Sequence, residues 1–248
     1  MRLFLIAVFG TGVALISALA ETEKAPTLDE LVAKNVEAKG GEQSLKSLQS
    51  LKLTGKLIVN EGQLQLALNQ TKKRPEEIRT EITLQGMTAV QAYDGKEGWK
   101  ISPFQGRKDP EKLSADDIKP LIYDAEIDGP LVDWKAKGST LEYLGREDVD
   151  GTSAYKIKVV RKNGDVNFVY LDPDHFLEIR ILTQRTRHGA QEEVEEDLSD
   201  YEKIAGVFIP FSTESGHKGD PDKQKLVIEK AEPNVQIDDA IFKFPTTK

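Results

Sequence analysis

The sequence contains no cysteine among its 248 residues. This absence excludes disulfide scaffolds, cysteine-ligated zinc, iron–sulfur clusters and thiol catalysis. It also excludes a lipid anchor attached to an N-terminal cysteine. Basic residues are in the minority, with 34 Lys and Arg against 42 Asp and Glu. The formal net charge of −8 argues against a general nucleic-acid binder and against docking on anionic lipid by charge alone.

The sequence also lacks the common motifs of catalytic sites. It has no G-x-S-x-G, no G-x-x-x-x-G-K-[ST], no H-E-x-x-H and no EF-hand loop. The three histidines, His175, His188 and His217, do not lie at ligand spacing from one another, and we interpret them as solvated loop residues. We therefore expect no enzymatic activity, no metal site and no cofactor; a hydrolase with an unrecognised site is the alternative.

The only long apolar run lies at the start of the chain. Residues 3–20 carry no charge, follow Arg2 and end in Ala18-Leu19-Ala20. This is the pattern of a signal peptide with a small-x-small cleavage site, so we predict that residues 1–20 are removed after Ala20. An uncleaved membrane anchor is the alternative, because the run is near the length that spans a bilayer. A mature chain, residues 21–248, without cysteine fits the bacterial periplasm.

The mature chain begins with a helical pattern and then changes to the alternation of β-strands. Thr27 and Glu30 form a capping box, and Gly40-Gly41 ends the helix. From Leu51 onward, apolar and polar residues alternate in short runs that turn residues separate. We count about eleven such runs. Since no linker divides them, we predict a single domain, mainly β with helices, built on an antiparallel sheet with one polar and one apolar face.

Residues 103–138 interrupt this alternation. Prolines punctuate the segment, and Ser114 with Asp117 is a second capping signature. We predict a short helix there, shortened or bent by Pro120. An amphipathic insert of this kind must bury its apolar side, so we expect it to cover the sheet.

Two charged runs have more than one interpretation. Residues 192–197 contain five acidic side chains, which we interpret as a solvated strand edge that resists pairing with other strands. A site for a cation or a basic partner is the alternative. Lys72-Lys73-Arg74 is the only concentrated basic run; it is too short for a nucleic-acid surface, and we interpret it as the charged end of a hairpin.

A secreted β architecture with helices to cover it and no catalytic set favours the binding of an apolar ligand between sheet and helices. The alternative is that the apolar face is simply the packed core. The candidates to line a cavity are apolar residues of the strands and of the segment that follows them: Leu64, Leu66, Leu68, Ile78, Ile82, Trp99 and Phe104.

Three motifs follow one another along the chain. Residues 73–78 read K-R-P-E-E-I, residues 93–103 read Y-D-G-K-E-G-W-K-I-S-P, and residues 242–245 read F-K-F-P. They resemble the K-R-P-x-x-[FLI] strand start, the S-D-G-K-x-x-W-x-Y-x-P hairpin and the closing F-x-F-x-P strand of the LolA family, the periplasmic carriers of outer-membrane lipoproteins. The chain thus looks like a divergent, lipoprotein-sorting branch of that family.

The resemblance implies an open half-barrel of about eleven strands under a helical lid, which residues 113–137 match by position. It implies that acyl chains of lipoproteins, or a similar lipid, pass from an inner-membrane donor through the cavity to an outer-membrane acceptor. Arg74 would hold the lid closed by binding lid carbonyls, and Ile78 would lie toward the cavity. We expect a monomer; a sensor on the same scaffold that acts on a membrane signalling partner is the alternative.

Overall fold

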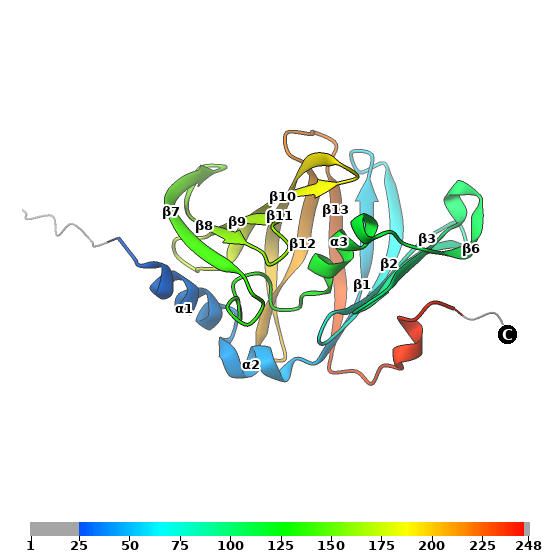
Figure 1. The fold of residues 1–248 in the computed structure, drawn as a ribbon, viewed down its shortest axis with the longest axis horizontal. Helices are drawn as coiled ribbons and strands as arrows, with labels where there is room; N and C mark the ends of the chain where they lie inside the picture. The colour runs from blue at the N-terminus through cyan, green and yellow to red at the C-terminus, as the bar shows by residue number, and fades with distance from the viewer. Residues whose placement is uncertain (1–24, 246–248) are drawn as a thin grey trace, which may run out of the picture.

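The computed structural model describes residues 25–245, so the predicted signal peptide lies outside the described residues. Within them the chain forms one antiparallel sheet of thirteen strands and three α-helices (Figure 1). The helices are α1 (Leu28–Ala38), α2 (Gly41–Ser47) and α3 (Ala115–Ala125). The strands are β1 (Ser50–Val59), β2 (Leu64–Lys73), β3 (Glu77–Leu84), β4 (Met87–Asp94), β5 (Gly98–Ser102), β6 (Arg107–Lys112), β7 (Thr140–Val149), β8 (Thr152–Val160), β9 (Val166–Leu171), β10 (Glu178–Arg187), β11 (Ala190–Ile204), β12 (Val207–His217) and β13 (Gln224–Pro233).

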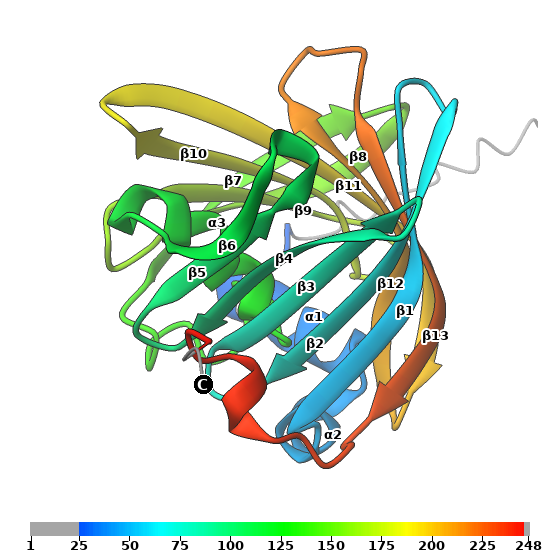
Figure 2. The same cartoon turned by 90° about the vertical axis from the view of Figure 1, so that its right-hand side faces the viewer.

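The sheet is open, with β6 at one edge and β7 at the other. Strands that follow one another in sequence pair with each other, except β6 and β7, and one further pairing, between β1 and β13, joins the first six strands to the last seven. Figure 2 shows the sheet curling so that β1–β6 form one wall and β7–β11 the facing wall, with β12 and β13 joining them. We call these the first wall and the second wall. The predicted fold class, a mainly β half-barrel covered by helices, is confirmed.

The number of strands differs from the sequence-based count, which was about eleven. The structure has thirteen. One strand that the prediction missed is β6, within the segment expected to serve only as a cover. Pro110 lies in β6, which is possible because this strand is at the edge of the sheet and one of its sides needs no ladder hydrogen bonds.

The C-terminal motif also takes a different form from the strand that the resemblance implied. Residues Asp239–Ile241 form a short 3-10 helix, and the residues from 242 to 245 are not in a strand. Phe242 is fully buried, and the indole Nε1 of Trp99 donates a hydrogen bond of 2.8 Å to its carbonyl. Side-chain contacts with the outer face of β5 hold this segment, instead of a ladder of backbone hydrogen bonds.

Helix α1 begins at the predicted capping box. The Thr27 hydroxyl accepts from the backbone N–H of Glu30 at 3.3 Å, and the Glu30 carboxylate accepts from the backbone N–H of Thr27 at 2.7 Å. The helix buries Leu31 in a cluster with Ile157 and Val169 of β8 and β9. Helix α1 therefore covers the far end of the second wall.

Helix α3 covers the first wall. Ser114 caps it as predicted, since its hydroxyl accepts from the backbone N–H of Asp117 at 3.2 Å. Leu121 and Ala125 pack on Ile78 of β3 and Tyr93 of β4. Because α1 and α3 cover opposite ends of the curved sheet, its concave middle is left between them.

One glycine is required where β1 meets β13. The register shifts between Thr54 and Gly55, and a Cβ on Gly55 would lie 2.0 Å from the carbonyl oxygen of Val227. We expect Gly55→Ala to lower the free energy of unfolding by about 1–3 kcal/mol, because backbone atoms would have to move. Urea denaturation measures this change.

Gly216→Ala is the matched control. A Cβ there would lie 3.0 Å from the flexible side chain of Lys223, which can move aside. An equal loss of stability in the two variants would contradict the explanation by backbone contact.

Candidate functional site

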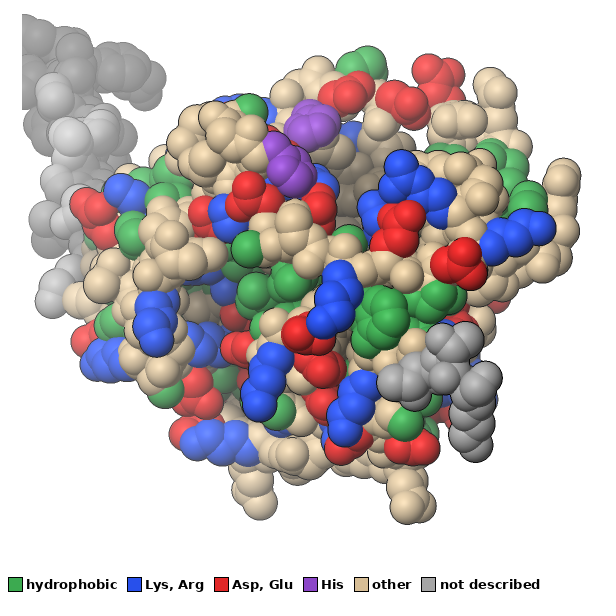
Figure 3. Space-filling view, turned by 45° about the vertical axis from the view of Figure 1, so that its right-hand side comes forward, with side chains coloured by type: hydrophobic (Ala, Val, Ile, Leu, Met, Phe, Trp, Pro, Cys, Tyr) green, Lys and Arg blue, Asp and Glu red, His purple; other side chains and the backbone are tan. Residues whose placement is uncertain are grey.

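A cavity of about 620 Å³ lies between the two walls. Its lining comes from β1–β4 on one side, from β10–β13 on the other, and from α3 with the segment that follows it. Figure 3 shows the surface hollowed on this side of the molecule. The volume is in the range of small-molecule sites, roughly 300–1,000 Å³.

Part of the lining is apolar. It belongs to a cluster in which Leu53 and Leu68 of the first wall pack with Ile228 of β13, and Ile82 and Leu226 lie against them. These side chains share the concave face because residues two apart in a strand point the same way. Apolar side chains thus form one zone of a cavity between the sheet and the helices.

The structure separates the seven candidate lining residues. Leu68 and Ile82 line the cavity, whereas Ile78 is fully buried beneath α3. Trp99 lies on the outer face of the sheet against Phe242 and Phe244, and Phe104 is 42% exposed.

Leu64 and Leu66 share the face of Leu68 but lie nearer the turn between β1 and β2 and do not line the cavity, although Leu57, the ladder partner of Leu66, does. Alternation assigns a side chain to one face of a strand. It does not say which part of that face a helix covers, so the pattern alone did not distinguish these residues.

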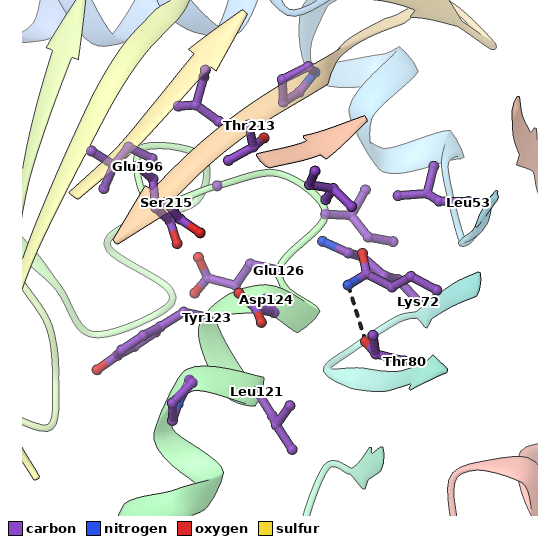
Figure 4. A pocket seen from close by; sticks show the side chains of 18 of the residues that line it. Leu53, Lys72, Thr80, Leu121, Tyr123, Asp124, Glu126, Glu196, Thr213 and Ser215 are labelled. Atoms are coloured by element: carbon purple, nitrogen blue, oxygen red, sulfur yellow. Dashed lines mark hydrogen bonds between the residues drawn. The ribbon is translucent and has the colours of Figure 1, made fainter. Parts of the chain in front are cut away.

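The rest of the lining contains charged side chains. Three of them, Lys72 on β2, Asp124 on α3 and Glu196 on β11, project around the cavity in Figure 4. Within residues 25–245 none of the three makes a hydrogen bond or an ion pair. We call them the unpaired triad.

Other charges of the lining are paired. The guanidinium of Arg161 donates to the Glu126 carboxylate at 2.7 Å, and Arg185 pairs with Glu192. These pairs satisfy their own charges, so the unpaired triad is distinct among the cavity residues.

Burial shifts the pKa of each member of the triad. It lowers the pKa of the Lys72 ammonium, which the nearby Asp124 carboxylate partly counteracts. Burial raises the pKa of Asp124, although Lys72 opposes the shift. Burial and then the charge of Asp124 raise the pKa of Glu196 to about 7. By accessible surface Asp124 is exposed and Lys72 and Glu196 are half-buried, and all three line the cavity.

Arg74 lies at the end of the cavity where β2 turns into β3. Its guanidinium donates to the carbonyls of Leu48 at 2.8 Å and Leu45 at 2.9 Å, at the end of α2. It also donates to the carboxylate of Asp128, which follows α3, at 2.7 Å. The resemblance implied that Arg74 binds backbone carbonyls of the lid; in the structure its carbonyl partners lie at the end of α2, and its partner in the segment after α3 is a carboxylate.

Lys39 adds a second contact to the same segment. Its ammonium donates to the carbonyl of Asp128 and to the carboxylate of Glu178 on β10, both at 2.9 Å. Asp128 therefore binds Arg74 of the first wall through its carboxylate and Lys39 through its backbone carbonyl. Lys39 in turn binds Glu178 of the second wall. All of these side chains are buried except that of Arg74, which is partly exposed.

The N-terminal end of α3 is tied to the second wall. Asp117 accepts from Arg187 and lies 3.0 Å from the His188 ring, at the hairpin between β10 and β11. The hydroxyl of Ser114 and the guanidinium of Arg187 hold the pKa of Asp117 well below its usual range. Lys119 of α3 also donates to the carbonyl of Thr186 at 2.6 Å. Helix α3 thus packs on one wall and is held by polar contacts to the other.

The interpretation of residues 192–197 as a solvated strand edge is wrong. Strand β11 is internal, since it pairs with β10 on one side and β12 on the other. Glu195 pairs with Lys223 at 2.7 Å, while Glu196 lines the cavity. The sequence contained a signal for this position. Glu196 lies two residues from both Val194 and Leu198, so the three side chains share one face of the strand.

Lys72-Lys73-Arg74 does lie at the end of the hairpin of β2 and β3, as predicted, but each of the three side chains has a specific environment. Lys72 points into the cavity, Lys73 pairs with Asp239, and Arg74 makes the contacts described above. Lys72 shares its face with Leu68, which is the pattern that could have placed it inside.

His188, which we interpreted as a solvated loop residue, also contacts Asp117 of α3.

Two further features concern the described part of the chain. Among residues 25–245, no group of three or more His, Asp or Glu side chains is placed to hold a metal ion. In the same range, no helix has the length and apolar character needed to cross a membrane.

No protein-family model and no curated protein matches the sequence, but solved structures share its fold. A domain assigned to outer membrane lipoprotein sorting from Vibrio parahaemolyticus has a TM-score of 0.58 and 12% identity, covering 85% of this chain and 94% of that one. A DUF1329 family protein from Desulfovibrio piger has a TM-score of 0.58 and 13% identity, with coverages of 87% and 96%. A LolA superfamily protein from Nitrosomonas europaea has a TM-score of 0.55 and 10% identity, with coverages of 86% and 96%. The fold is LolA-like.

The LolA-like fold agrees with the resemblance that the three sequence motifs carried. At 10–13% identity the likeness concerns the fold alone, and the chain is a divergent variant of it. The charged residues of the cavity therefore have to be interpreted from this structure itself.

The raised pKa of Glu196 predicts a dependence of stability on pH. The folded chain holds this proton more tightly than the unfolded chain, so stability falls as the pH rises from about 4.5 through about 7. Glu196→Gln removes this contribution. We expect the variant to gain up to about 3 kcal/mol over the native chain between pH 4.5 and pH 8.

Urea denaturation at several pH values measures the difference. Glu202→Gln, an exposed position on the same strand, is the control and should show little difference at any pH. A constant difference between Glu196→Gln and the native chain across this range would contradict the burial of an ionising carboxyl.

Proposed function

We propose that this protein is a periplasmic carrier that holds the acyl chains of a lipoprotein or a similar lipid in its cavity for transfer toward the outer membrane. The observation that carries the proposal is the cavity of about 620 Å³, with its apolar zone, beneath a helix tied to both walls. The LolA-like fold and the signal-peptide pattern support it. The proposed role involves no catalysis and no cofactor.

The apolar zone supplies the binding free energy in this proposal. Each acyl methylene that leaves water contributes about 0.8 kcal/mol. Burial of a few methylenes against Leu68 and Ile82 is enough for useful affinity. Affinity of this kind depends on the length of the chain more than on its identity, which suits a carrier of several cargoes.

Helix α3 serves as the lid. Its N-terminal end is held through Asp117 and Arg187, and the segment after it is held through Asp128 and Arg74. Asp117, Arg187 and Arg74 are partly exposed, whereas Asp128 is buried, so water can reach one or both partners of each contact when the lid opens. A ligand that favours the open arrangement shifts the balance between the two arrangements by its difference in affinity.

Lipid binding tests the proposal directly. The protein is purified from the periplasm without detergent, its organic extract is examined by mass spectrometry, and the protein is titrated with a fluorescent fatty acid. We expect co-purified acyl lipid and saturable binding. Absence of lipid from the extract together with absence of fatty-acid binding would exclude the carrier role.

A substitution in the cavity locates the bound chain. We expect Ile82→Glu to weaken binding of the fluorescent fatty acid at least tenfold, because a carboxylate would replace an apolar contact in the cavity. Thr83→Glu, on the opposite face of the same strand, is the matched control and should bind like the native chain. Equal affinities in the two variants would place the ligand elsewhere.

The contacts of the lid predict a change in rate. Arg187→Leu removes the guanidinium that holds the N-terminal end of α3. We expect faster uptake and faster release of the fluorescent fatty acid in stopped-flow measurements, with a small change in affinity.

Arg74→Leu should increase binding of an apolar dye in a chain that remains folded by circular dichroism. Native rates and native dye binding in both folded variants would show that these residues do not close the lid.

A further inference from the structure

The unpaired triad lies in a setting where charge is costly. Lys72, Asp124 and Glu196 come from β2, α3 and β11, three elements far apart in sequence, and all three line the same cavity (Figure 4). Burying a charge without a partner costs free energy, and proteins normally pair such groups. Within the described residues the neighbouring charges Arg161 and Arg185 are paired, whereas the triad is not. Its members are thus available to a ligand.

The signs of the triad select the ligand. It consists of one ammonium and two carboxyl groups. A purely anionic ligand would be attracted by Lys72 and repelled by Asp124 and Glu196. A purely cationic ligand would pair with the carboxyl groups but leave Lys72 without a partner. A ligand that carries an ammonium and a phosphate or carboxylate close together satisfies both signs.

Polar groups surround the triad. Ser215 faces Glu196 across the ladder between β11 and β12, and Thr213 lies two residues earlier on the same face. Their hydroxyls line the cavity and can donate to a phosphate or carboxylate or accept from an ammonium. These groups extend the charged zone with neutral partners.

The apolar zone continues from the charged zone along the same strand. Leu68 is four residues from Lys72 on the concave face of β2, a distance of about 13 Å along the strand at about 3.3 Å per residue. Ile82 is the ladder partner of Leu68. A single amphiphile can therefore contact Lys72 with its headgroup while its chain lies on Leu68 and Ile82.

We infer that the cavity is a site for a zwitterionic amphiphile, with the headgroup held by Lys72, Asp124 and Glu196 and the acyl chain on the apolar zone. This inference rests on the proposed carrier function and adds a class of ligand to it. The ammonium of the headgroup lies against Asp124 and Glu196, and its phosphate or carboxylate lies against Lys72. The headgroup is then inside the cavity together with the chain.

Single-chain lipids with the same acyl chain and different headgroups test this inference. Lysophosphatidylethanolamine is the zwitterion, lysophosphatidylglycerol the anion, and an alkyltrimethylammonium of equal chain length the cation. Each displaces the fluorescent fatty acid from the full mature protein below its critical micelle concentration. We expect the zwitterion to bind at least tenfold more tightly than either of the others.

Variants of the triad should remove this preference. In Lys72→Met, Asp124→Asn and Glu196→Gln we expect the affinity for the zwitterion to fall at least fivefold, while the affinity for the fluorescent fatty acid is retained or increased in Asp124→Asn and Glu196→Gln. Lys52→Gln and Glu202→Gln, exposed positions on β1 and β11, are the matched controls and should keep the preference. Circular dichroism and thermal unfolding establish that each variant is folded.

The outcomes separate the two proposals. Equal affinity for the three lipids, or tighter binding of the anion or the cation, overturns the inference and leaves the carrier function in place. A preference that persists in all three folded triad variants also overturns it. Failure of every lipid and of the fluorescent fatty acid to bind overturns the carrier function and the inference together.

Discussion

The pairing of β1 with β13 is the contact on which the rest of the structure depends. It joins a six-stranded and a seven-stranded stretch of the chain into one curved sheet, so that two walls face each other. Gly55 permits this pairing, because the Val227 carbonyl occupies the space that a side chain would need. A curved open sheet leaves a concave face that the three helices only partly cover. The cavity is a consequence of that geometry.

The contacts of α3 follow from the same constraint. The helix packs its apolar residues on Ile78 and Tyr93 of the first wall, and only polar groups remain to reach the second wall. Asp117, near the N-terminal end of α3, makes this contact with Arg187 of β10, while Asp128, which follows α3, accepts from Arg74 of the first wall. Apolar packing on one side and exchangeable polar contacts on the other are the properties of a hinged cover. In the proposed carrier, these contacts would allow uptake and release of a ligand.

The cavity combines two kinds of surface that a packed core does not combine. Its apolar zone is continuous with the cluster around Leu53 and Leu68, while the unpaired triad brings charges of both signs to the same space. In a core these charges would be paired or replaced, because their burial costs free energy. The zwitterionic amphiphile that we infer would pair with them in this space of about 620 Å³.

The sequence by itself determined the local elements. The capping box at Thr27, the N-cap at Ser114 and the alternation of the strands depend on interactions between near neighbours, and the structure confirms them. Three motifs pointed to the LolA-like fold. Whether a strand lies inside the sheet or at its edge was decided only by the tertiary structure. Strand β11, which we interpreted from the sequence as an edge, has β10 on one side and β12 on the other. The curved sheet brings Glu196 of β11 and Lys72 of β2, which looked like surface charges in the sequence, into one cavity. Alternation assigns a face, but only the assembled sheet and its covering helix decide whether that face meets water, a packed core or a cavity.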